Sequence, residues 1–184
     1  MNLEQLIKEA KQGSSAAEKC LFDEMADSML LVCCRYVKNR QDAEEILLDG
    51  FFRFFKNMSS FQFQHDPALY NWIKKIMINQ CLMFFRKKNS FSMVTEKEAT
   101  DVALQEDALS NLSADEIFSL IIQLPVGYRT VFNLSVMEDM DHKEIAALLG
   151  IAEGTSRSQL SKAKSMLQQM LIQKGVTYER NKYR

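Results

Sequence analysis

The chain has 184 residues with a formal net charge of −1, and 47% of them are hydrophobic, which is enough for a packed core. Only two prolines and six glycines occur, and the abundant leucine, methionine, lysine, glutamate and alanine favour helix over sheet. No apolar run approaches the roughly 18 to 20 residues that span a bilayer, and the first residues do not resemble a signal peptide. We therefore expect a cytoplasmic, all-α protein.

The sequence gives no support for metal, cofactor or catalytic chemistry. Its four cysteines form no CxxC pair and its two histidines lie far apart, whereas metal sites need ligands at suitable spacing. Each cysteine falls within a helical pattern, where a free thiol packs as a small hydrophobe. No glycine-rich phosphate loop or nucleophile–base pair is present. We expect a protein that is not an enzyme and that binds no metal or cofactor.

The small net charge hides an uneven distribution along the chain. Residues 1–88 carry 13 basic and 11 acidic side chains, a net +2. Residues 89–116 carry one basic and seven acidic side chains, a net −6, and residues 117–184 carry nine basic and six acidic ones, a net +3. Two mildly basic ends therefore flank an acidic middle.

Apolar residues at helical spacing predict four helices in the first half of the chain. The first covers residues 3–10, and the second runs from the Gly13-Ser14-Ser15 turn to about Tyr36. Asn39 is the expected cap of the third helix. The fourth is expected to begin with Asp66 as its cap and Pro67 as its first residue, and to end near Lys88.

The second half opens with an acidic stretch, residues 89–112, which has few large apolar residues and is typical of a linker with at most a short helical turn. A capping box at Ser113 and Glu116 then begins a further set of helices. These are expected at 114–124, 126–137, 142–149 and 155–171. The prediction is two small helical domains, 1–88 and 113–184, joined by the linker.

The strongest local pattern is a helix-turn-helix in the second domain. Asp141 and Glu144 form a cap pair, and Gly150 ends the helix where a positive φ is needed. A second helix starts near Thr155 after a short turn. In this motif the second helix can enter the major groove of DNA.

One side of that second helix is a candidate DNA contact. At 100° per residue its apolar residues gather in one arc, and serines and cations without a carboxylate occupy the opposite side. Arginine and lysine can pair with guanine, and serine with phosphate or base edges. An ordinary solvated amphipathic helix is the alternative. The candidate DNA-binding residues are Thr155, Ser156, Arg157, Ser158, Ser161, Lys162 and Lys164.

This segment resembles region four of the extracytoplasmic-function (ECF) group of bacterial sigma factors. The matching positions are Leu124-Pro125, Tyr128-Arg129, Phe132, Leu134, Glu144-Ile145-Ala146, Leu149-Gly150-Ile151, Gly154-Thr155, Ser158, Leu160, Ala163 and Leu167. The resemblance implies that the second helix reads the −35 promoter element, through Arg157, Ser158, Ser161 and Lys162.

Residues 42–51, Asp-Ala-Glu-Glu-Ile-Leu-Leu-Asp-Gly-Phe, resemble the region-two signature of the same group. Outside the core stripe of this helix, three acids line up beside two apolar residues, which suits an interface; a plain solvated face is the alternative. The resemblance implies binding to the beta-prime clamp helices of RNA polymerase. The candidate residues are Asp42, Glu45, Leu48, Asp49 and Phe52. Leu48 replaces the family's usual glutamine, so that contact must differ here.

The fourth helix resembles the family's Trp-Leu…Ile-Ala-x-Asn…Arg-Arg stretch. A strip of cations, an amide and an aromatic edge suits single-stranded DNA, whose bases stack while its phosphates meet positive charge. The resemblance assigns the strip and the preceding loop to capture of the melted −10 strand. The candidates are Phe61, Phe63, Trp72, Lys75, Asn79, Arg86, Lys87 and Lys88. Trp72 taken alone is more typical of a core residue, and Met83 replaces a frequent aspartate, which leaves the base preference open.

The resemblance implies a sigma factor that directs promoter-specific transcription initiation. Its expected partners are core RNA polymerase, through the beta-prime clamp helices and the beta flap, and promoter DNA. An anti-sigma factor is a further candidate partner. The acidic linker would either mimic RNA inside the polymerase or act as an ordinary tether. Two other functions stay open: a stand-alone helix-turn-helix regulator, and a helical interaction protein without a DNA function.

Overall fold

The computed structural model describes residues 2–88 and 113–173. Every regular element within these two stretches is helical, which confirms the all-α prediction there. The contacts divide the chain into two compact units, one within residues 1–90 and one within residues 91–184. In the described part of the chain, no helix is both long and apolar enough to cross a membrane. The expected linker at 89–112 lies outside the described residues.

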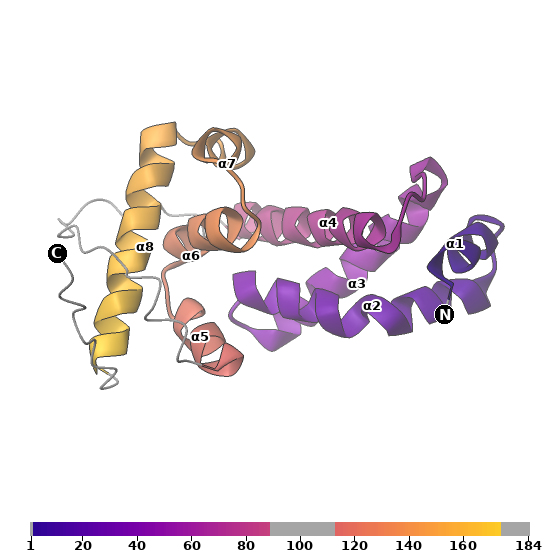
Figure 1. Ribbon diagram of the computed structural model, residues 1–184, viewed down its shortest axis with the longest axis horizontal. Helices are drawn as coiled ribbons and strands as arrows, with labels where there is room; N and C mark the ends of the chain where they lie inside the picture. Colours follow the sequence, from indigo (N-terminus) through magenta and orange to yellow (C-terminus); the bar gives the residue numbers. More distant parts are fainter. Residues whose placement is uncertain (1, 89–112, 174–184) are drawn as a thin grey trace, which may run out of the picture. The chain divides into compact units, whose positions relative to one another are not determined.

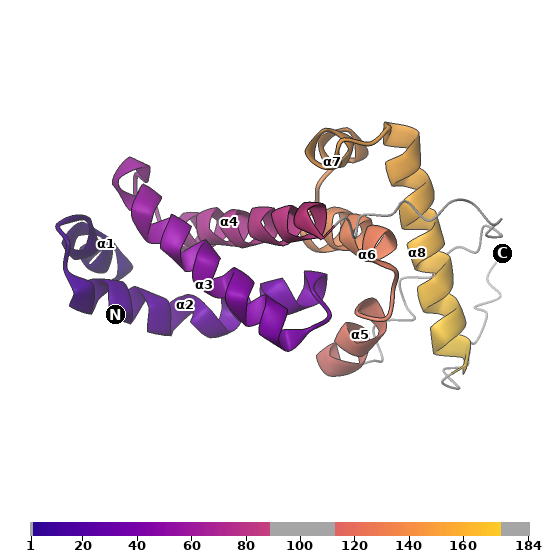
Figure 2. The ribbon, with the colours of Figure 1, turned by 180° about the vertical axis from the view of Figure 1, so that it is seen from behind.

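Within residues 2–88, the first unit contains four α-helices and one short 3-10 turn. They are α1 (Leu3–Lys11), α2 (Ser15–Tyr36), α3 (Arg40–Asn57), the 3-10 turn η1 (Met58–Ser60) and α4 (Asp66–Lys87). Helices α2, α3 and α4 pack against one another, and α1 folds back on α2 (Figures 1 and 2). This arrangement leaves one side of α3 and one side of α4 without a covering helix from the unit.

In the first unit the helix starts follow the sequence closely, with one exception at α4. Asn39 Oδ1 accepts hydrogen bonds from the backbone of Gln41 at 2.8 Å and of Asp42 at 3.2 Å, which confirms the predicted cap. The expected Asp66 cap is wrong, because the His65 ring accepts the bond from Ala68 N at 3.1 Å and α4 already begins at Asp66. In the first turn the Asp66 carboxylate lies near the positive helix end.

The core of the first unit lies between α2, α3 and α4. Its fully buried side chains include Leu21, Met25, Tyr36, Phe54, Leu69, Ile73 and Met77. Met77 of α4 packs directly on Gly50 of α3, where an added Cβ would lie 2.2 Å from Met77 Sδ. The absence of a side chain at Gly50 therefore makes room for Met77 between the two helices.

Within residues 113–173, the second unit contains four α-helices and one π-helical segment. They are α5 (Ala114–Ile121), α6 (Val126–Phe132), the π-helical segment η3 (Asn133–Met137), α7 (His142–Leu149) and α8 (Glu153–Gln173). The predicted helix 126–137 is one continuous run whose last turn widens, with Glu138 N bonded to Asn133 O at 3.1 Å. The predicted 114–124 helix ends earlier, at Ile121, ahead of Pro125.

Helix α8 is the centre of the second unit. Helices α5, α6 and α7 all pack on it, and α7 lies against its first turns (Figure 1). The predicted apolar arc of α8 is confirmed, since Ala163, Leu167 and Leu171 are buried in a cluster with residues of α5 and α6. The opposite side of α8 carries the candidate DNA contacts.

Candidate polymerase and nucleic-acid interfaces

The helix-turn-helix has the geometry that the sequence predicts. Asp141 Oδ1 accepts a hydrogen bond from Glu144 N at 2.7 Å, and Glu144 Oε2 accepts one from Asp141 N at 3.1 Å. Gly150 ends α7 with φ of 69°, in the left-handed region, which glycine adopts without strain. The turn then leads directly into α8.

Two polar residues in the first turns of α8 face the protein interior. Ser156 is fully buried, and its Oγ lies 2.9 Å from Nδ1 of His142 on α7. Gln159 is buried against α6, where an added Cβ on Gly127 would lie 3.1 Å from its Oε1. Because α7 covers Ser156, the prediction that this residue contacts DNA is wrong for the structure as it stands. His142 instead links the two helices of the motif.

The other candidate residues of α8 remain accessible. Arg157 and Ser158 are exposed, while Thr155, Ser161, Lys162 and Lys164 are half-buried. Ser158 Oγ donates to Thr155 O at 3.0 Å. The exposed side of the recognition helix therefore presents mainly cations and hydroxyl groups.

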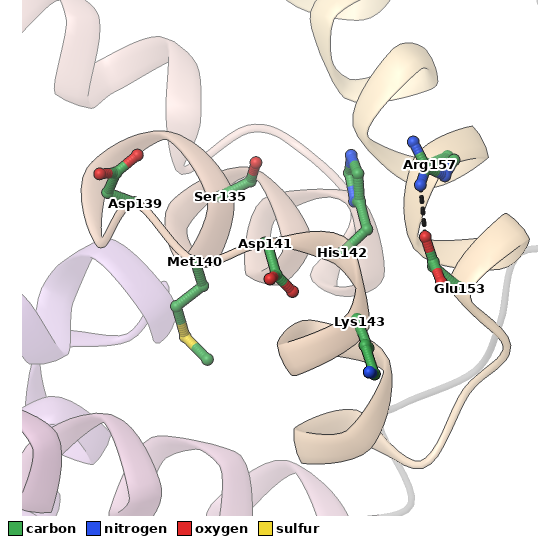
Figure 3. A pocket seen from close by; sticks show the side chains of 8 residues that line it. All are labelled: Ser135, Asp139, Met140, Asp141, His142, Lys143, Glu153 and Arg157. Carbon is green, nitrogen blue, oxygen red and sulfur yellow. Dashed lines mark hydrogen bonds and ion pairs between the residues drawn. The ribbon is translucent and has the colours of Figure 1, made fainter.

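The start of α8 also carries an acid that the sequence reasoning missed. Helix α8 begins at Glu153, two residues before the expected start, and Glu153 Oε1 forms an ion pair with Arg157 one turn later. Both side chains border a hollow of about 450 Å³ (Figure 3). Its lining residues are Ser135, Asp139, Met140, Asp141, His142, Lys143, Glu153 and Arg157. The side of α8 that faces this hollow therefore carries a carboxylate, that of Glu153.

The predicted polymerase-binding residues form one exposed surface on α3. Leu48 is 60% exposed and Phe52 is 69% exposed, one helical turn apart. Glu45 and Asp49 are exposed beside them, and Asp42 is half-buried. We call these five residues the docking surface. Large apolar side chains at this exposure, bordered by carboxylates, are typical of a protein interface.

A hollow of about 260 Å³ lies between the docking surface and the end of α4. Asp42, Glu45 and Asp49 line it from α3, and Met83, Lys87 and Lys88 are among the residues that line it from α4. Lys88 Nζ lies 3.1 Å from Asp42 Oδ2. A residue predicted to bind DNA is therefore paired with a residue predicted to bind polymerase.

The predicted −10 strip lies along the exposed side of α4. Lys75, Asn79 and Arg86 are all exposed on that helix. At its beginning Trp72 is half-buried, with the Phe61 ring stacked on it at 4.5 Å between centroids and the Phe54 ring tilted at 5.1 Å. The stacked Phe61 ring covers one face of Trp72, so a base can stack on that face only if Phe61 moves. The half-buried Phe63 follows in the same loop.

A lysine of α1 holds this loop in place. Lys11 Nζ donates to Phe61 O at 2.5 Å, so the stacked ring is tied to α1 as well as to α4. This contact joins residues 50 positions apart, and no local pattern in the sequence indicates it.

Two buried groups with shifted pKa values support the fold beneath these surfaces. Burial lowers the pKa of Arg129, whose Nη1 donates to Ile122 O and Leu124 O at 2.9 Å each and so satisfies the end of α5. A hydrogen bond with Cys33 and burial raise the pKa of the Cys81 thiol well above its ordinary value. Within residues 2–88 and 113–173, no group of acids, histidines or cysteines could hold a metal ion.

Comparison with known protein families agrees with this arrangement. The family model "Sigma-70 region 2" matches residues 21–91, and "Sigma-70, region 4" matches residues 114–167. The chain belongs to the sigma-70 family. The order of the two matches confirms the family predicted from the motifs at 42–51 and 141–164.

Three curated relatives are similar to this chain along most of their length and of its own. The ECF RNA polymerase sigma factor SigW of Bacillus subtilis is 27% identical over 184 residues, 93% of this chain and 97% of SigW. The ECF RNA polymerase sigma-E factor of Haemophilus influenzae is 23% identical, over 89% of this chain and 92% of its own. The RNA polymerase sigma-H factor of Pseudomonas aeruginosa is 26% identical, over 91% of this chain and 93% of its own length.

These findings place the chain in the ECF group of sigma factors. As such it binds core RNA polymerase and promoter DNA and directs transcription initiation at promoters. Sigma factors are not known as enzymes.

Proposed function

We propose that this sigma factor uses three separate surfaces during initiation. The docking surface on α3 binds the beta-prime clamp helices of the polymerase. Residues of the α4 strip, with Phe61 and Phe63, capture the melted −10 strand. The exposed side of α8, which we call the recognition surface, holds the −35 duplex in the major groove.

The observation that carries the proposal is the exposure of Leu48 and Phe52 on the docking surface. Burying two such side chains against a partner contributes roughly 1.5 to 3 kcal/mol each. Carboxylates around them favour a partner with basic groups at its rim, because opposite charges steer association and set its register. The docking surface is therefore suited to binding a large protein partner.

The α4 strip supports the second role through its mixture of groups. Lys75 and Arg86 can meet phosphates, Asn79 can bond a base edge, and Phe61 offers a ring for stacking. Base–aromatic stacking is worth about 1 to 3 kcal/mol per base and works on unpaired strands. The strip therefore fits melted DNA better than duplex.

The recognition surface supports the third role, but weakly by itself. Phosphate contacts dominate the affinity of proteins for duplex DNA, and α8 offers only Arg157, Lys162 and Lys164 as cations. We infer that the free protein binds promoters poorly and needs polymerase to position it. Because core polymerase and its promoters share the bacterial cytoplasm, we propose that the protein acts there, by binding rather than by catalysis.

Run-off transcription with purified core polymerase tests the proposal. Templates carry an intact promoter, a scrambled −35 element or a scrambled −10 element. We expect transcription only when the protein and core polymerase are both present, with a loss on either scrambled template. Tight, specific duplex binding by the protein alone, with no effect on transcription by core polymerase, would instead identify a stand-alone helix-turn-helix regulator.

A further inference from the structure

The first turn of α8 presents one charged pair at the edge of the hollow between α7 and α8. Glu153 Oε1 pairs with an Nη atom of Arg157, and the two side chains lie side by side across from His142 (Figure 3). Their side chains are 45% and 64% exposed. Glu153 Oε2 has no hydrogen-bond partner among the residues that the structure describes.

The neighbouring polar residues are less suited to reading bases. Ser156 is buried against His142, and Gln159 is buried against Gly127. The hydroxyl of Ser158 is already bonded to a backbone oxygen. In these first two turns, Glu153 and Arg157 are therefore the exposed long side chains with hydrogen-bonding groups to offer.

In a helix-turn-helix, the N-terminal residues of the second helix contact base edges. Arginine pairs with O6 and N7 of guanine, and glutamate accepts from N4 of cytosine. Side chains four positions apart are separated by about 6 Å along a helix, which is close to two base steps of about 3.4 Å. The pair thus has the reach to read neighbouring base pairs.

A carboxylate at this place opposes DNA binding unless it makes a specific bond, because it approaches a polyanion. Its pairing with Arg157 offsets that repulsion and also holds the guanidinium in one orientation. An oriented guanidinium loses less side-chain freedom when it binds a guanine.

We propose that Glu153 is a specificity-determining residue for the −35 element. Its carboxylate accepts a hydrogen bond from the exocyclic amine of a cytosine, and it holds Arg157 against a guanine within two base pairs. This inference rests on the proposed role of the recognition surface. The competing explanation is that Glu153 only supplies a negative charge to the positive end of α8.

Run-off transcription from a promoter library randomised across the −35 element separates these explanations. The full chain is assayed with core polymerase as the wild type and as Glu153→Ala, Glu153→Gln and Asp115→Asn. Asp115 is the matched control, because it is an exposed acid in the first turn of α5 in the same unit. Circular dichroism checks that all four proteins keep their helix content.

We expect the wild type to prefer cytosine at one −35 position by about fivefold or more, as a mismatch in a specific site typically costs. Glu153→Ala reduces this preference below about twofold, and Glu153→Gln shifts it to adenine, which a glutamine amide pairs with. Asp115→Asn keeps the wild-type profile. A Glu153→Ala profile equal to that of the wild type, apart from a uniform change in yield, overturns the inference and leaves the proposed function standing. A wild type indifferent to the −35 sequence overturns both.

Discussion

Lys88 Nζ lies 3.1 Å from Asp42 Oδ2, so the last cation predicted to bind the −10 strand is paired with the first acid of the docking surface. Lys88 also lies over the Phe84 ring, 4.3 Å from its centroid. A partly exposed ion pair of this kind contributes about 0 to 1 kcal/mol, and it can break when a stronger partner arrives. Lys88 can contact a DNA phosphate only after its ion pair with Asp42 breaks. The neighbouring Lys87 is exposed at the hollow between α3 and the end of α4.

We therefore expect the two lysines to differ in their effect on melted DNA. In holoenzyme, Lys87→Ala should weaken binding of a single-stranded −10 oligonucleotide and lower the salt slope by about 0.7, the value for one phosphate contact on a single strand. Lys88→Ala should leave both quantities within error of the wild type. A salt titration of oligonucleotide binding measures this, and equal losses in the two variants would contradict the assignment.

The recognition surface should be separable from polymerase docking. Arg157→Ala with Lys162→Ala removes two cations from α8, so transcription should lose its dependence on the −35 sequence while co-elution with core polymerase persists. Lys8→Ala with Lys19→Ala is the control, since these exposed lysines of α1 and α2 carry the same charge away from every proposed surface. Loss of core binding in the α8 variant would mean that the surface assignment is wrong.

Arg129 should be essential for the stability of the second unit. Its guanidinium is buried and bonded to two backbone oxygens, and hydrogen bonds to a charged group contribute about 1.5 to 3 kcal/mol. We expect Arg129→Ala to lower the free energy of unfolding of α5–α8 by about 2 to 3 kcal/mol. Arg129→Lys should not restore it, because an ammonium group lacks the planar fork.

Hydrogen exchange of backbone amides in α5–α8 measures this loss directly, with α1–α4 as the internal reference. Protection in α1–α4 should stay unchanged, because the Arg129 guanidinium bonds to Ile122 O and Leu124 O within the second unit. Unchanged protection of α5–α8 in Arg129→Ala would show that the buried cation is dispensable.

The parts of the fold that depend on local sequence could be predicted. The Asn39 cap, the Asp141–Glu144 capping box and the Gly150 terminator all involve residues within a few positions of one another. The exposed α3 surface also followed from helical spacing alone. Such features depend on neighbouring residues rather than on long-range packing, so a local pattern is enough to predict them.

Two features that the sequence does not predict depend on contacts between helices. Ser156 looks like a surface residue on a helical wheel, and only the packing of α7 places it against His142. The pairing of Lys88 with Asp42 joins positions 46 residues apart. Glu153 differs from the prediction for a local reason: the sequence pattern predicts a start of α8 near Thr155, whereas the helix begins at Glu153 and so includes this acid.

Alkaline pH should destabilise the first unit through the buried thiol of Cys81. The hydrogen bond with Cys33 and burial raise the pKa of Cys81, so the folded protein keeps this proton at a pH where the unfolded chain has lost it. The contribution of Cys81 to the free energy of unfolding is thus fully present below the ordinary thiol pKa of about 8.5. It falls as the pH rises above that value, by at most about 1.4 kcal/mol per pH unit.

Urea unfolding between about pH 8 and pH 10, on either side of the ordinary thiol pKa, measures this dependence. Cys81→Ala should show a shallower decline than the wild type, although its stability at neutral pH is lower because of the cavity. Cys20→Ala is the control, because Cys20 is exposed, and it should keep the wild-type decline. A Cys81→Ala variant that declines like the wild type would remove Cys81 as the cause.

The most direct test of the whole account is size-exclusion chromatography of the purified chain with core RNA polymerase. The wild type should co-elute with the polymerase in a one-to-one ratio, while Asp42→Lys with Glu45→Lys should co-elute much less, because the reversed charges repel the basic groups of the partner. Asp23→Lys with Asp27→Lys, two exposed acids of α2, should co-elute like the wild type. A wild-type chain that elutes apart from the polymerase, or a docking-surface variant that binds as well as the wild type, would contradict the account.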